Sequence, residues 1–486
     1  MDSPAVLIDK TEIPIGNESN LLELIRKAGI ELPTFCYDPE LSIFGSCRMC
    51  IVEVEGRGIM PACSTKPENG MVISTNTKQV RDFRKMILEL MLAGHDQECT
   101  TCPKNGGCRL QSISKDLGVT EVRYKHIPHI EPRDLSSDAI ARDMSKCILC
   151  GDCVRVCDEK QSVRALNFTN RGIQARVMPA FNKNLADVEC VSCGHCVKVC
   201  PVGALTVTPG ASGVWAAIHD SEKTVVVQVA PAARKALGKA FGETSGSVGT
   251  GKTISALKLM GFDRVYDTAF SSQAVMAEVG MEFEKTEKRP LFTSTCPAWT
   301  TFAGYFYPDL PGTLSSCKSP QQMFGALCKD KLAAQMGIAR EDLVVVSVMP
   351  CTAKKHEARL EKNITDGNPD VDHVLTPDEL IMMIEEMNIA WGELAQSAFD
   401  VPFIPPAGDG AETGVLRVVA DMLEKDPGSY GIKTCEEVVD GKTLKIAVVT
   451  GLANARKLID DIKSGEESYD LVKVMSCTDG CAHGRD

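Results

Sequence analysis

The hydrophobic positions of the first 95 residues change from a period of two to a period near that of a helix. The segments 5–16 (AVLIDKTEIPIG) and 51–63 (IVEVEGRGIMPAC) alternate, so each predicts a β-hairpin, the second turning at Glu55–Gly56. The segments 20–30 (NLLELIRKAGI) and 78–94 (KQVRDFRKMILELMLAG) have the apolar spacing of amphipathic helices. The pattern predicts a small β-rich module with one helix, followed by a longer helix.

From about residue 211 short apolar runs alternate with helical stretches, which predicts an α/β organisation with mostly parallel strands. The predicted strands are TVVVQVAP (224–231), RPLFTST (289–295), LVVVSVMPC (343–351), LKIAVVTG (444–451) and YDLVKVMSC (469–477). Cys296, Cys351 and Cys477 stand at the ends of three of them. Sites in such folds lie at the carboxyl ends of strands, so these thiols and Cys481 could converge, although packing would also explain each one.

Composition limits the classes of partner. The chain has 486 residues, enough for about three or four domains, and a net charge of −12, which argues against nucleic acid and anionic membranes. The first sixteen residues lack the basic and apolar segments of a cleavable signal, and no apolar run approaches the roughly 18 residues of a membrane span. A cytoplasmic protein without nucleic-acid or membrane contacts is expected.

Cysteine changes this ordinary picture. The chain has 22 cysteines, and fifteen of them lie between residues 36 and 200. In a reducing cytoplasm such a density predicts metal ligation rather than a disulfide framework. The spacings then indicate which metal centre each group could hold.

The first set has the pattern C-x10-C-x2-C-x12-C and comprises Cys36, Cys47, Cys50 and Cys63. Gly45 lies two residues before its second cysteine and would let the backbone approach a cluster closely. The segment resembles a plant-type [2Fe–2S] ferredoxin domain of β-grasp form, in the longer-spaced variant of respiratory complex subunits. Zinc is the alternative.

The second set has the pattern H-x3-C-x2-C-x5-C and comprises His95, Cys99, Cys102 and Cys108. One imidazole and three thiolates could hold zinc or a [4Fe–4S] cluster. Its place between a [2Fe–2S] module and a ferredoxin repeat favours the cluster.

An internal repeat follows, CILCGDCVRVC (147–157) and CVSCGHCVKVCP (190–201). This is the bacterial two-cluster ferredoxin run, in which the fourth cysteine of one run ligates the other cluster. Cubane A is predicted to use Cys147, Cys150, Cys153 and Cys200. Cubane B is predicted to use Cys190, Cys193, Cys196 and Cys157. The first run departs from the usual pattern in having Asp158 in place of proline.

One further motif matches a phosphate-binding loop, GSVGTGKT (246–253). Such a loop needs a strand directly before it, whereas a helix-like segment, ARKALGKAF (233–241), separates it from the preceding strand. Lys252 is instead predicted to begin the helix KTISALKLMGF (252–262), and no nucleotide site is expected.

Four segments of the C-terminal half together resemble the signature segments of [FeFe]-hydrogenases. They are TSTCPAW (293–299), LSSCKSPQQMFGA (314–326), VMPCTAKKHEA (348–358) and VMSCTDGC (474–481). The upstream cysteine modules match the large multi-cluster form of that family in the same order. The resemblance implies a [2Fe–2S] ferredoxin-like domain at 1–80, a His–Cys [4Fe–4S] domain at 81–122, a two-[4Fe–4S] ferredoxin domain at 123–210 and a hydrogenase-type domain at 211–486.

The resemblance also implies a site. The family's H-cluster joins a cubane to a two-iron subcluster carrying CO, cyanide and a dithiolate. By position Cys296, Cys351, Cys477 and Cys481 would be its ligands, with Cys481 as the bridge. Lys354 would bond a cyanide, and Met349, Met475 and Pro231 would line the pocket.

The proton path departs from the family pattern. Thr295 stands where a proton-relaying cysteine is usual, and Val279 replaces an expected carboxylate, whereas Glu282 and Ser315 fit two further relay positions. Asp479, the ending AHGRD and the short loop at 407–416 also depart from it. The remaining cysteines, Cys317, Cys328 and Cys435, are expected to be buried structural thiols, and His126, His129, His356 and His483 have no assigned role.

The predicted function is the reversible reaction 2H⁺ + 2e⁻ ⇌ H₂, with electrons carried by a chain of iron–sulfur clusters. The predicted cofactors are one [2Fe–2S] cluster, three accessory [4Fe–4S] clusters and the H-cluster. No flavin or dinucleotide motif is present, so flavin- or NAD(P)-binding subunits, a formate dehydrogenase subunit or ferredoxin are expected partners. The alternatives are an electron-transfer scaffold with a degenerate site and a hydrogen sensor.

Overall fold

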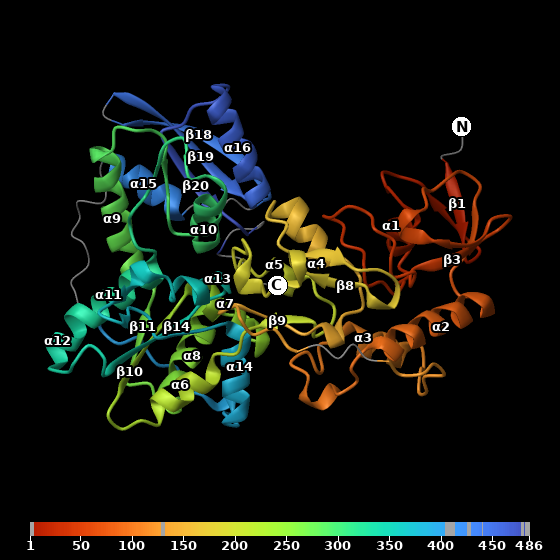
Figure 1. Ribbon diagram of the computed structural model, residues 1–486, viewed down its shortest axis with the longest axis horizontal. Coiled ribbons are helices and arrows are strands. Elements are labelled where there is room, and N and C mark those ends of the chain that lie inside the picture. The colour runs from red at the N-terminus through yellow and green to blue at the C-terminus, as the bar shows by residue number, and fades with distance from the viewer. Residues whose placement is uncertain are drawn as a thin grey trace.

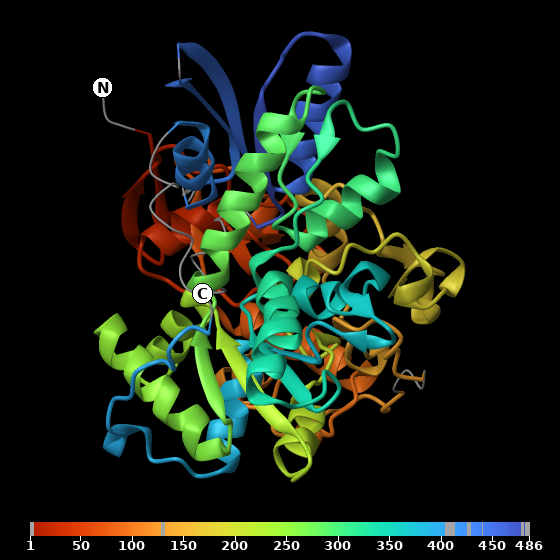
Figure 2. The same ribbon diagram turned by 90° about the vertical axis from the view of Figure 1, so that its left-hand side faces the viewer.

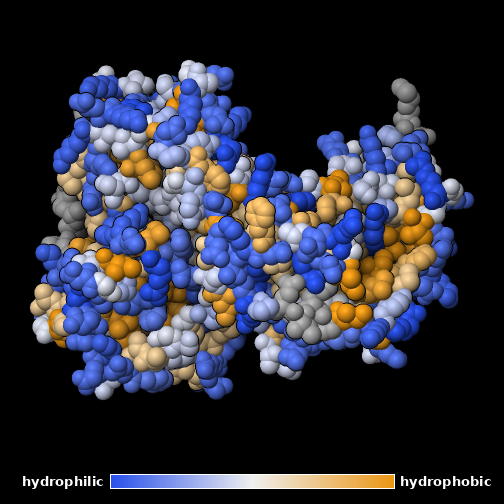
Figure 3. All heavy atoms as spheres, viewed as in Figure 1, coloured by the Kyte–Doolittle hydropathy of each residue, from blue (hydrophilic) through white to orange (hydrophobic). Residues whose placement is uncertain are grey.

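The computed structural model describes residues 4–127, 132–403, 414–424, 429–439, 441–477 and 481. Figure 1 shows two lobes formed by the C-terminal half at the left, the N-terminal modules at the right, and the ferredoxin repeat between them. No helix of the described residues is long and apolar enough to cross a membrane. The surface is mostly hydrophilic, with a hydrophobic patch over the N-terminal modules at the right of Figure 3.

The N-terminal module is a five-stranded sheet of order β2-β1-β5-β3-β4 with helix α1 packed on it. Both predicted hairpins are confirmed, since β1 pairs antiparallel with β2, and β3 with β4. The strands are β1 (Ala5–Ile8), β2 (Thr11–Pro14), β3 (Ile51–Val54), β4 (Gly58–Pro61) and β5 (Val72–Ser74). Helix α1 (Leu21–Lys27) begins at Asn20, whose side chain accepts a hydrogen bond from the Glu23 amide.

Two helices carry the chain from this module to the repeat. The predicted helix over 78–94 is confirmed as α2 (Lys78–Gly94), and its N-cap Thr77 accepts a hydrogen bond from the Val80 amide. Helix α2 ends directly before His95, and α3 (Arg109–Asp116) begins directly after Cys108. The second cysteine set therefore lies in the loop between two helices.

The ferredoxin repeat is visible in the backbone. Each cysteine run contains a left-handed glycine, Gly151 with φ 83° and Gly194 with φ 76°, which starts a short helix, α4 (Asp152–Arg155) or α5 (His195–Lys198). The antiparallel pair β6 (Ile140–Arg142) and β9 (Leu205–Val207) closes the module. A hairpin of β7 (Asn167–Thr169) and β8 (Arg176–Met178) stands between the two runs.

The strands of the C-terminal half divide between two sheets. The first has the order β11-β10-β14-β17 and is fully parallel, and the second has the order β13-β12-β20-β19-β18 with only β18 antiparallel. The prediction of mostly parallel strands is confirmed, but the division into two sheets was not predicted. The sheets remain separate in the turned view, with the blue strands above the yellow-green ones (Figure 2).

The first sheet is formed by β10 (Thr224–Val229), β11 (Arg264–Asp267), β14 (Leu343–Val348) and β17 (His373–Leu375). Helices that cover it include α6 (Ala211–Ile218), α7 (Pro231–Ala240), α8 (Gly246–Met260), α11 (Pro320–Leu327), α12 (Ala333–Met336) and α14 (Pro377–Glu386). The side chains of 225–229 and 343–348 are all buried, as expected for a parallel sheet covered on both faces.

The second sheet is formed by β12 (Leu291–Phe292), β13 (Thr313–Leu314), β18 (Gly431–Val439), β19 (Lys442–Thr450) and β20 (Leu471–Met475). Its helices are α9 (Ala269–Lys285), α10 (Pro297–Phe306), α15 (Gly414–Glu424) and α16 (Leu452–Ser464). The short helix α13 (Ala353–Glu357) follows β14 of the first sheet and contacts α10 of the second lobe.

The glycine-rich segment 246–253 is helical throughout. Helix α8 begins at Gly246, six residues earlier than predicted, so no phosphate-binding loop forms. The reason is a close contact between helices: a Cβ on Gly249 would lie 3.1 Å from the Cα of Gly238 in α7. Lys252 pairs with Glu243 at 2.7 Å instead of facing a ligand.

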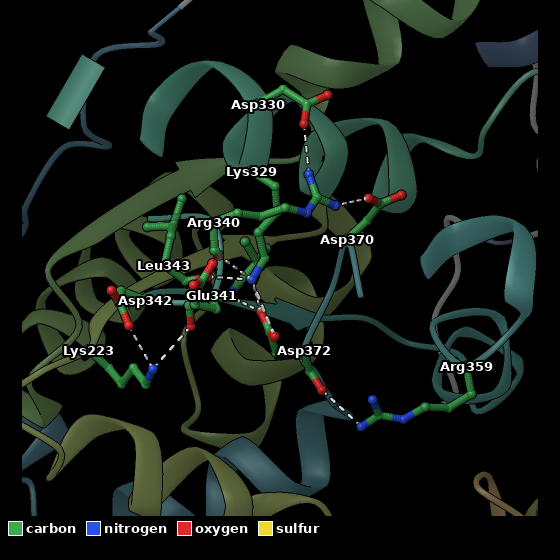
Figure 4. A network of polar contacts seen from close by, with 11 residues as sticks. Lys223, Lys329, Asp330, Arg340, Glu341, Asp342, Leu343, Arg359, Asp370 and Asp372 are labelled. Atoms are coloured by element: carbon green, nitrogen blue, oxygen red, sulfur yellow. Dashed lines mark hydrogen bonds and ion pairs between the residues drawn. The ribbon is translucent and has the colours of Figure 1, made fainter. Parts of the chain in front are cut away.

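A network of ion pairs holds the start of β14 (Figure 4). The buried Lys329 ammonium donates to the Leu343 carbonyl at 2.5 Å and pairs with Asp372 at 3.0 Å. Asp372 in turn accepts a hydrogen bond from the Val345 amide at 2.7 Å. Because β14 leads to Cys351, this network fixes the strand that delivers one of the predicted ligands.

Hydrogen bonds join the ferredoxin repeat to both lobes. Gln161 Nε2 donates to the Ser476 carbonyl at 3.0 Å, and Thr352 Oγ1 donates to the Ser192 carbonyl at 2.9 Å. Three of these residues, Ser192, Thr352 and Ser476, are direct neighbours of predicted ligand cysteines. The loops of cubane B and of the C-terminal cysteines are therefore held against each other.

Replacing Arg456 with alanine is expected to loosen this junction. Arg456 on α16 donates to Ser162 Oγ at 2.8 Å and to the Ser162 carbonyl at 3.0 Å, and its guanidinium lies over the Phe302 ring at 5.1 Å. Loss of these contacts should lower the free energy of unfolding by about 2 kcal/mol. The melting temperature of the C-terminal half, measured by calorimetry, should fall by about 5 °C. The exposed neighbour Lys457, replaced by alanine, should leave that temperature unchanged.

Candidate metal centres

The first cysteine set lies in the loop before β3 and at the end of β4. All four of its thiols are buried. The Cys47 amide lies 3.4 Å from Cys36 Sγ, and the Phe35 amide 3.5 Å from Cys47 Sγ. A hydrogen bond from Cys47 lowers the pKa of Cys36 to about 5, and one from Cys63 lowers that of Cys50 to about 7. Paired thiols with amide donors fit a thiolate-bound cluster.

The second set lines a cavity of about 320 Å³ between α2 and α3, which His95, Cys99, Cys102 and Cys108 all border. His95 is buried, and its Nδ1 has no hydrogen-bond partner in the part of the chain that the structure describes. Burial lowers the pKa of His95, which keeps the imidazole neutral and able to bind a metal. The size of the cavity and this donor set fit a [4Fe–4S] cluster.

The crossed arrangement of the repeat is visible in the fold. An apolar cavity is bordered by Cys147, Cys150 and Cys153 of the first run and by Cys200 of the second. Burial raises the pKa of Cys147 to about 12, and that of Cys153 rises well above its usual value through burial and its neighbouring thiols. Such a set is costly to ionise without a cation, and iron would replace the thiol protons.

The set predicted for cubane B also consists of thiols whose pKa burial raises. Burial raises the pKa of Cys190 to about 12, with a further contribution from the neighbouring Cys157. Cys196 has its pKa raised by burial and then by Cys193, Cys190 and Cys157. The structure thus brings Cys157 to the second run, as the crossed prediction requires.

The C-terminal cysteines meet where the two sheets face each other. Cys296 comes four residues after β12, Cys351 three residues after β14, and Cys477 two residues after β20, so both sheets contribute a strand end. Burial raises the pKa of Cys296 to about 11, followed by contributions from Cys481 and Cys351. A hydrogen bond with Cys481, then burial, raises that of Cys477. Cys481 itself is exposed.

This fourth set adjoins cubane B. The thiol of Cys351 contributes to the raised pKa of Cys193, after burial and the thiols of its own run. Together with the hydrogen bond between Thr352 and Ser192, this places a second-run cysteine beside the C-terminal group. The last thiol set of the ferredoxin repeat therefore lies beside the C-terminal thiol group.

The residues predicted to surround the fourth set differ in burial and in contacts. The Lys354 ammonium lies 3.3 Å from the Thr295 carbonyl and 2.9 Å from Glu357 Oε2. Met349 and Met475 are buried, whereas Pro231, the first residue of α7, is exposed. Gln321 Nε2 donates to the Lys354 carbonyl, while its buried Oε1 has no partner among the described residues.

The outer part of the predicted proton path is assembled. Glu282 of α9 accepts hydrogen bonds from Ser315 Oγ, from the Ser316 amide at 2.9 Å and from Ser316 Oγ at 3.0 Å. The half-buried Thr295 follows β12, the strand adjacent to β13 that delivers Ser315. Within the described residues no hydrogen bond joins the Thr295 side chain to Ser315 or Glu282, so the inner end is not connected directly.

Sequence reasoning missed two carboxylates. Glu357, three residues after Lys354 on α13, forms an ion pair with it at 2.9 Å, which the i,i+3 spacing could have indicated. Glu278 lies 3.4 Å from the buried Cys317 thiol, one helical turn before Glu282 and beside Val279, the position predicted to have lost its carboxylate. Of the other cysteines, Cys328 is buried as expected, whereas Cys435 is only half-buried.

Several predicted features cannot be placed. Asp479, His129, His483, the last five residues and most of the 407–416 loop lie outside the described residues. His126 is exposed, and His356 lies 3.7 Å from Asp138. In the described ranges no three His, Cys, Asp or Glu side chains are arranged to hold a single metal ion.

Comparison with known families defines the class. Residues 223–485 match the iron-only hydrogenase large subunit, C-terminal domain. Upstream, residues 5–78 match a 2Fe-2S iron-sulfur cluster binding domain, 84–123 the NADH-ubiquinone oxidoreductase-G iron-sulfur binding region, and 137–206 the ferredoxin-like domain of NADH-quinone oxidoreductase subunit 3. The chain belongs to the iron-only hydrogenase family, in its large multi-cluster form, and the predicted resemblance is confirmed.

Individual relatives agree with this class. The NADP-reducing hydrogenase subunit HndD of Solidesulfovibrio fructosivorans is 38% identical over 100% of this chain and 88% of its own length. Iron hydrogenase 1 of Clostridium pasteurianum is 32% identical over 99% of this chain and 88% of its own. A solved variant of [FeFe]-hydrogenase HydA1 from Chlamydomonas reinhardtii has a TM-score of 0.50 and 31% identity, covering 56% of this chain and 83% of that one.

The chain is therefore an iron–sulfur oxidoreductase of hydrogenase type. Its domains are those of a [2Fe–2S] cluster, of [4Fe–4S] clusters and of the hydrogenase site. The predicted fold class, a β-grasp-like module followed by cluster modules and an α/β hydrogenase-type domain, is confirmed.

Proposed function

We propose that the chain catalyses 2H⁺ + 2e⁻ ⇌ H₂ as the iron–sulfur subunit of a larger NAD(P)-linked complex. The observation that carries this proposal is the gathering of Cys296, Cys351, Cys477 and Cys481 at the facing ends of two sheets. The series of upstream thiol sets ends beside this group. Its similarity to the NADP-reducing hydrogenase subunit HndD supports the NAD(P)-linked partner; formate dehydrogenase subunits and ferredoxin are further candidates.

The proposed cofactors follow the thiol sets. Cys36, Cys47, Cys50 and Cys63 would hold one [2Fe–2S] cluster, and three accessory [4Fe–4S] clusters would occupy the His95 set and the two crossed sets. The fourth set would hold the cubane of the H-cluster, with Cys481 bridging to a two-iron subcluster. This amounts to about 20 irons per chain.

The two-iron subcluster, when bound, supplies the open metal position at which protons and electrons combine. The chain's own residues would prepare that position. The Lys354 ammonium, held by Glu357 at 2.9 Å, supplies a fixed positive charge and a donor for an anionic ligand. The buried Met349 and Met475 would keep water away from it. Glu282 and Ser315 would bring protons from the surface of α9 to the loop beside Thr295.

Infrared spectroscopy and hydrogen turnover of the matured protein test this function together. Bands of metal-bound CO and cyanide with hydrogen evolution from reduced viologen are expected. A protein with about 18 irons, no such bands and no turnover would instead be an electron-transfer scaffold. The missing link between Thr295 and the carboxylate is the observation that favours this second candidate.

Replacing Thr295 with cysteine is expected to raise hydrogen turnover about tenfold. A thiol titrates near pH 8.5, whereas a threonine hydroxyl has no accessible titration and can pass a proton only in a concerted chain. The measurement is the hydrogen evolution rate per subcluster, counted from the infrared bands. Thr300 on the neighbouring helix, replaced by cysteine, serves as the control, and a rate for the Thr295 variant equal to that of the parent would rule out a weak inner relay.

A further inference from the structure

The hairpin between the two cubane runs has an unusual composition and surface. Residues 167–184 contain three Lys or Arg and no Asp or Glu, in a chain whose net charge is −12. The side chain of Phe181 is 92% exposed and that of Ile173 is 68% exposed. Neither Arg171 nor Lys183, both exposed, forms an ion pair with any residue that the structure describes. The hairpin thus presents two cations, Arg171 and Lys183, beside uncovered apolar side chains.

The backbone shortly after β8 is also strained. Phe181 has φ 58° and Asn182 has φ 55°, in the left-handed region that a bulky aromatic residue rarely adopts. Strained residues persist where the surrounding structure or a function requires them, and they cluster at binding sites. An aromatic side chain held in such a conformation and pointed into solvent indicates a contact made with another molecule.

The base of the hairpin lies on the cluster loops. Phe168 of β7 stacks on Phe44 with ring centroids 5.7 Å apart, and Phe44 stands beside Gly45 in the loop of the first cysteine set. A Cβ on Gly151, between Cys150 and Cys153, would lie 2.8 Å from Phe44 and 3.2 Å from Phe168. Figure 1 shows β8 between α4 and the N-terminal module. A molecule bound to the hairpin would therefore sit next to two of the proposed clusters.

We propose that this hairpin, residues 167–184, is the docking surface for a small acidic iron–sulfur electron carrier. The patch is small and mixes a few apolar side chains with cations and asparagines, as in transient redox encounters rather than permanent subunit contacts. The cations would steer an acidic carrier and Phe181 would anchor it. In each encounter the carrier loses one electron, and the [2Fe–2S] cluster or cubane A gains it.

The inference rests on the proposed accessory clusters and not on hydrogen turnover, so the test follows cluster reduction alone. A photochemically reduced, acidic two-[4Fe–4S] ferredoxin is mixed with the oxidised full-length protein, and cluster bleaching is recorded by stopped flow. The variant Arg171→Glu/Lys183→Glu should lower the second-order rate at least tenfold, and Phe181→Ser about fivefold. Added salt should slow the parent and not the charge-reversed variant.

The controls match charge and exposure at a distance from the hairpin. Lys285→Glu/Lys331→Glu makes the same change in net charge on the C-terminal lobes, and Val401→Ser removes another exposed apolar side chain; both should react at the parental rate. Reduction by methyl viologen should be equal in all variants. Parental ferredoxin rates in the hairpin variants would overturn the proposal, as would an equal loss of rate in the charge-matched control.

Discussion

Replacing Cys351 with alanine is expected to abolish hydrogen turnover and to leave the upstream clusters in place. Cys351 is the contribution of the first sheet to the C-terminal thiol group, whereas Cys296 and Cys477 come from the second. Without Cys351 only three thiolates remain, all from the second sheet and the segment after it. The C-terminal cubane and the two-iron subcluster should therefore be lost. The expected result is turnover below detection, with about 14 irons retained per chain.

The measurements are iron content, infrared bands and hydrogen evolution on the same preparation. Cys328→Ala is the matched control, because this thiol is completely buried in the core of the first sheet and belongs to no set. It should lose some stability, about 1 kcal/mol, and keep full turnover. If the Cys351 variant still evolved hydrogen, this cysteine would not be a ligand. If both variants lost turnover equally, the loss would reflect damage to the lobe.

Replacing Glu282 with glutamine is expected to lower hydrogen turnover on the order of 10²-fold. The amide has nearly the same size and can still accept the hydrogen bond that the Ser316 amide now donates at 2.9 Å. It cannot take up and release a proton, which is what a carboxylate between the surface and Ser315 would do. The infrared bands should remain unchanged, since Glu282 touches none of the thiol sets.

Glu284 provides the control, because it is an exposed carboxylate on the same helix and makes no hydrogen bond to Ser315 or Ser316 in the described part of the chain. Glu284→Gln should leave turnover and its solvent isotope effect at the parental values. Loss of the infrared bands in the Glu282 variant would show a structural role instead. Unchanged turnover with intact bands would mean that protons use another path, for which Glu278 beside Cys317 is a candidate carboxylate.

Local patterns predicted the N-terminal half well, because its elements are set by local sequence. The helix over 78–94 has apolar residues at helical spacing and a threonine cap, and the second hairpin has Gly56 at its turn, whereas the first turns at Asp9–Lys10. The crossed pairing of the ferredoxin repeat stays a prediction, which the spacing of the two-cluster run suggests. The cavity bordered by Cys147 and Cys200 agrees with it.

Features that depend on distant contacts were not predictable. In helix α8, Gly249 packs against Gly238 and Gly251 against Gln396, and nothing in the segment itself reveals these neighbours. The five predicted apolar runs divide between two sheets according to which strands pair. The sequence of one run does not indicate its pairing partner. Glu278 was overlooked because its role depends on Cys317, which lies 39 residues away.

The hydrogen bonds from Gln161 to the Ser476 carbonyl and from Thr352 to the Ser192 carbonyl limit how much of the N-terminal part can be removed. Cutting the chain at residue 210 would remove the hydrogen-bond partners of the Ser476 carbonyl and the Thr352 hydroxyl. Each of these residues adjoins a cysteine of the C-terminal thiol group. A fragment that keeps both hydrogen bonds would therefore have to include Gln161 and Ser192 of the ferredoxin repeat. The loops of cubane B and those that carry Cys351 and Cys477 support one another, and a cut at residue 210 would separate them.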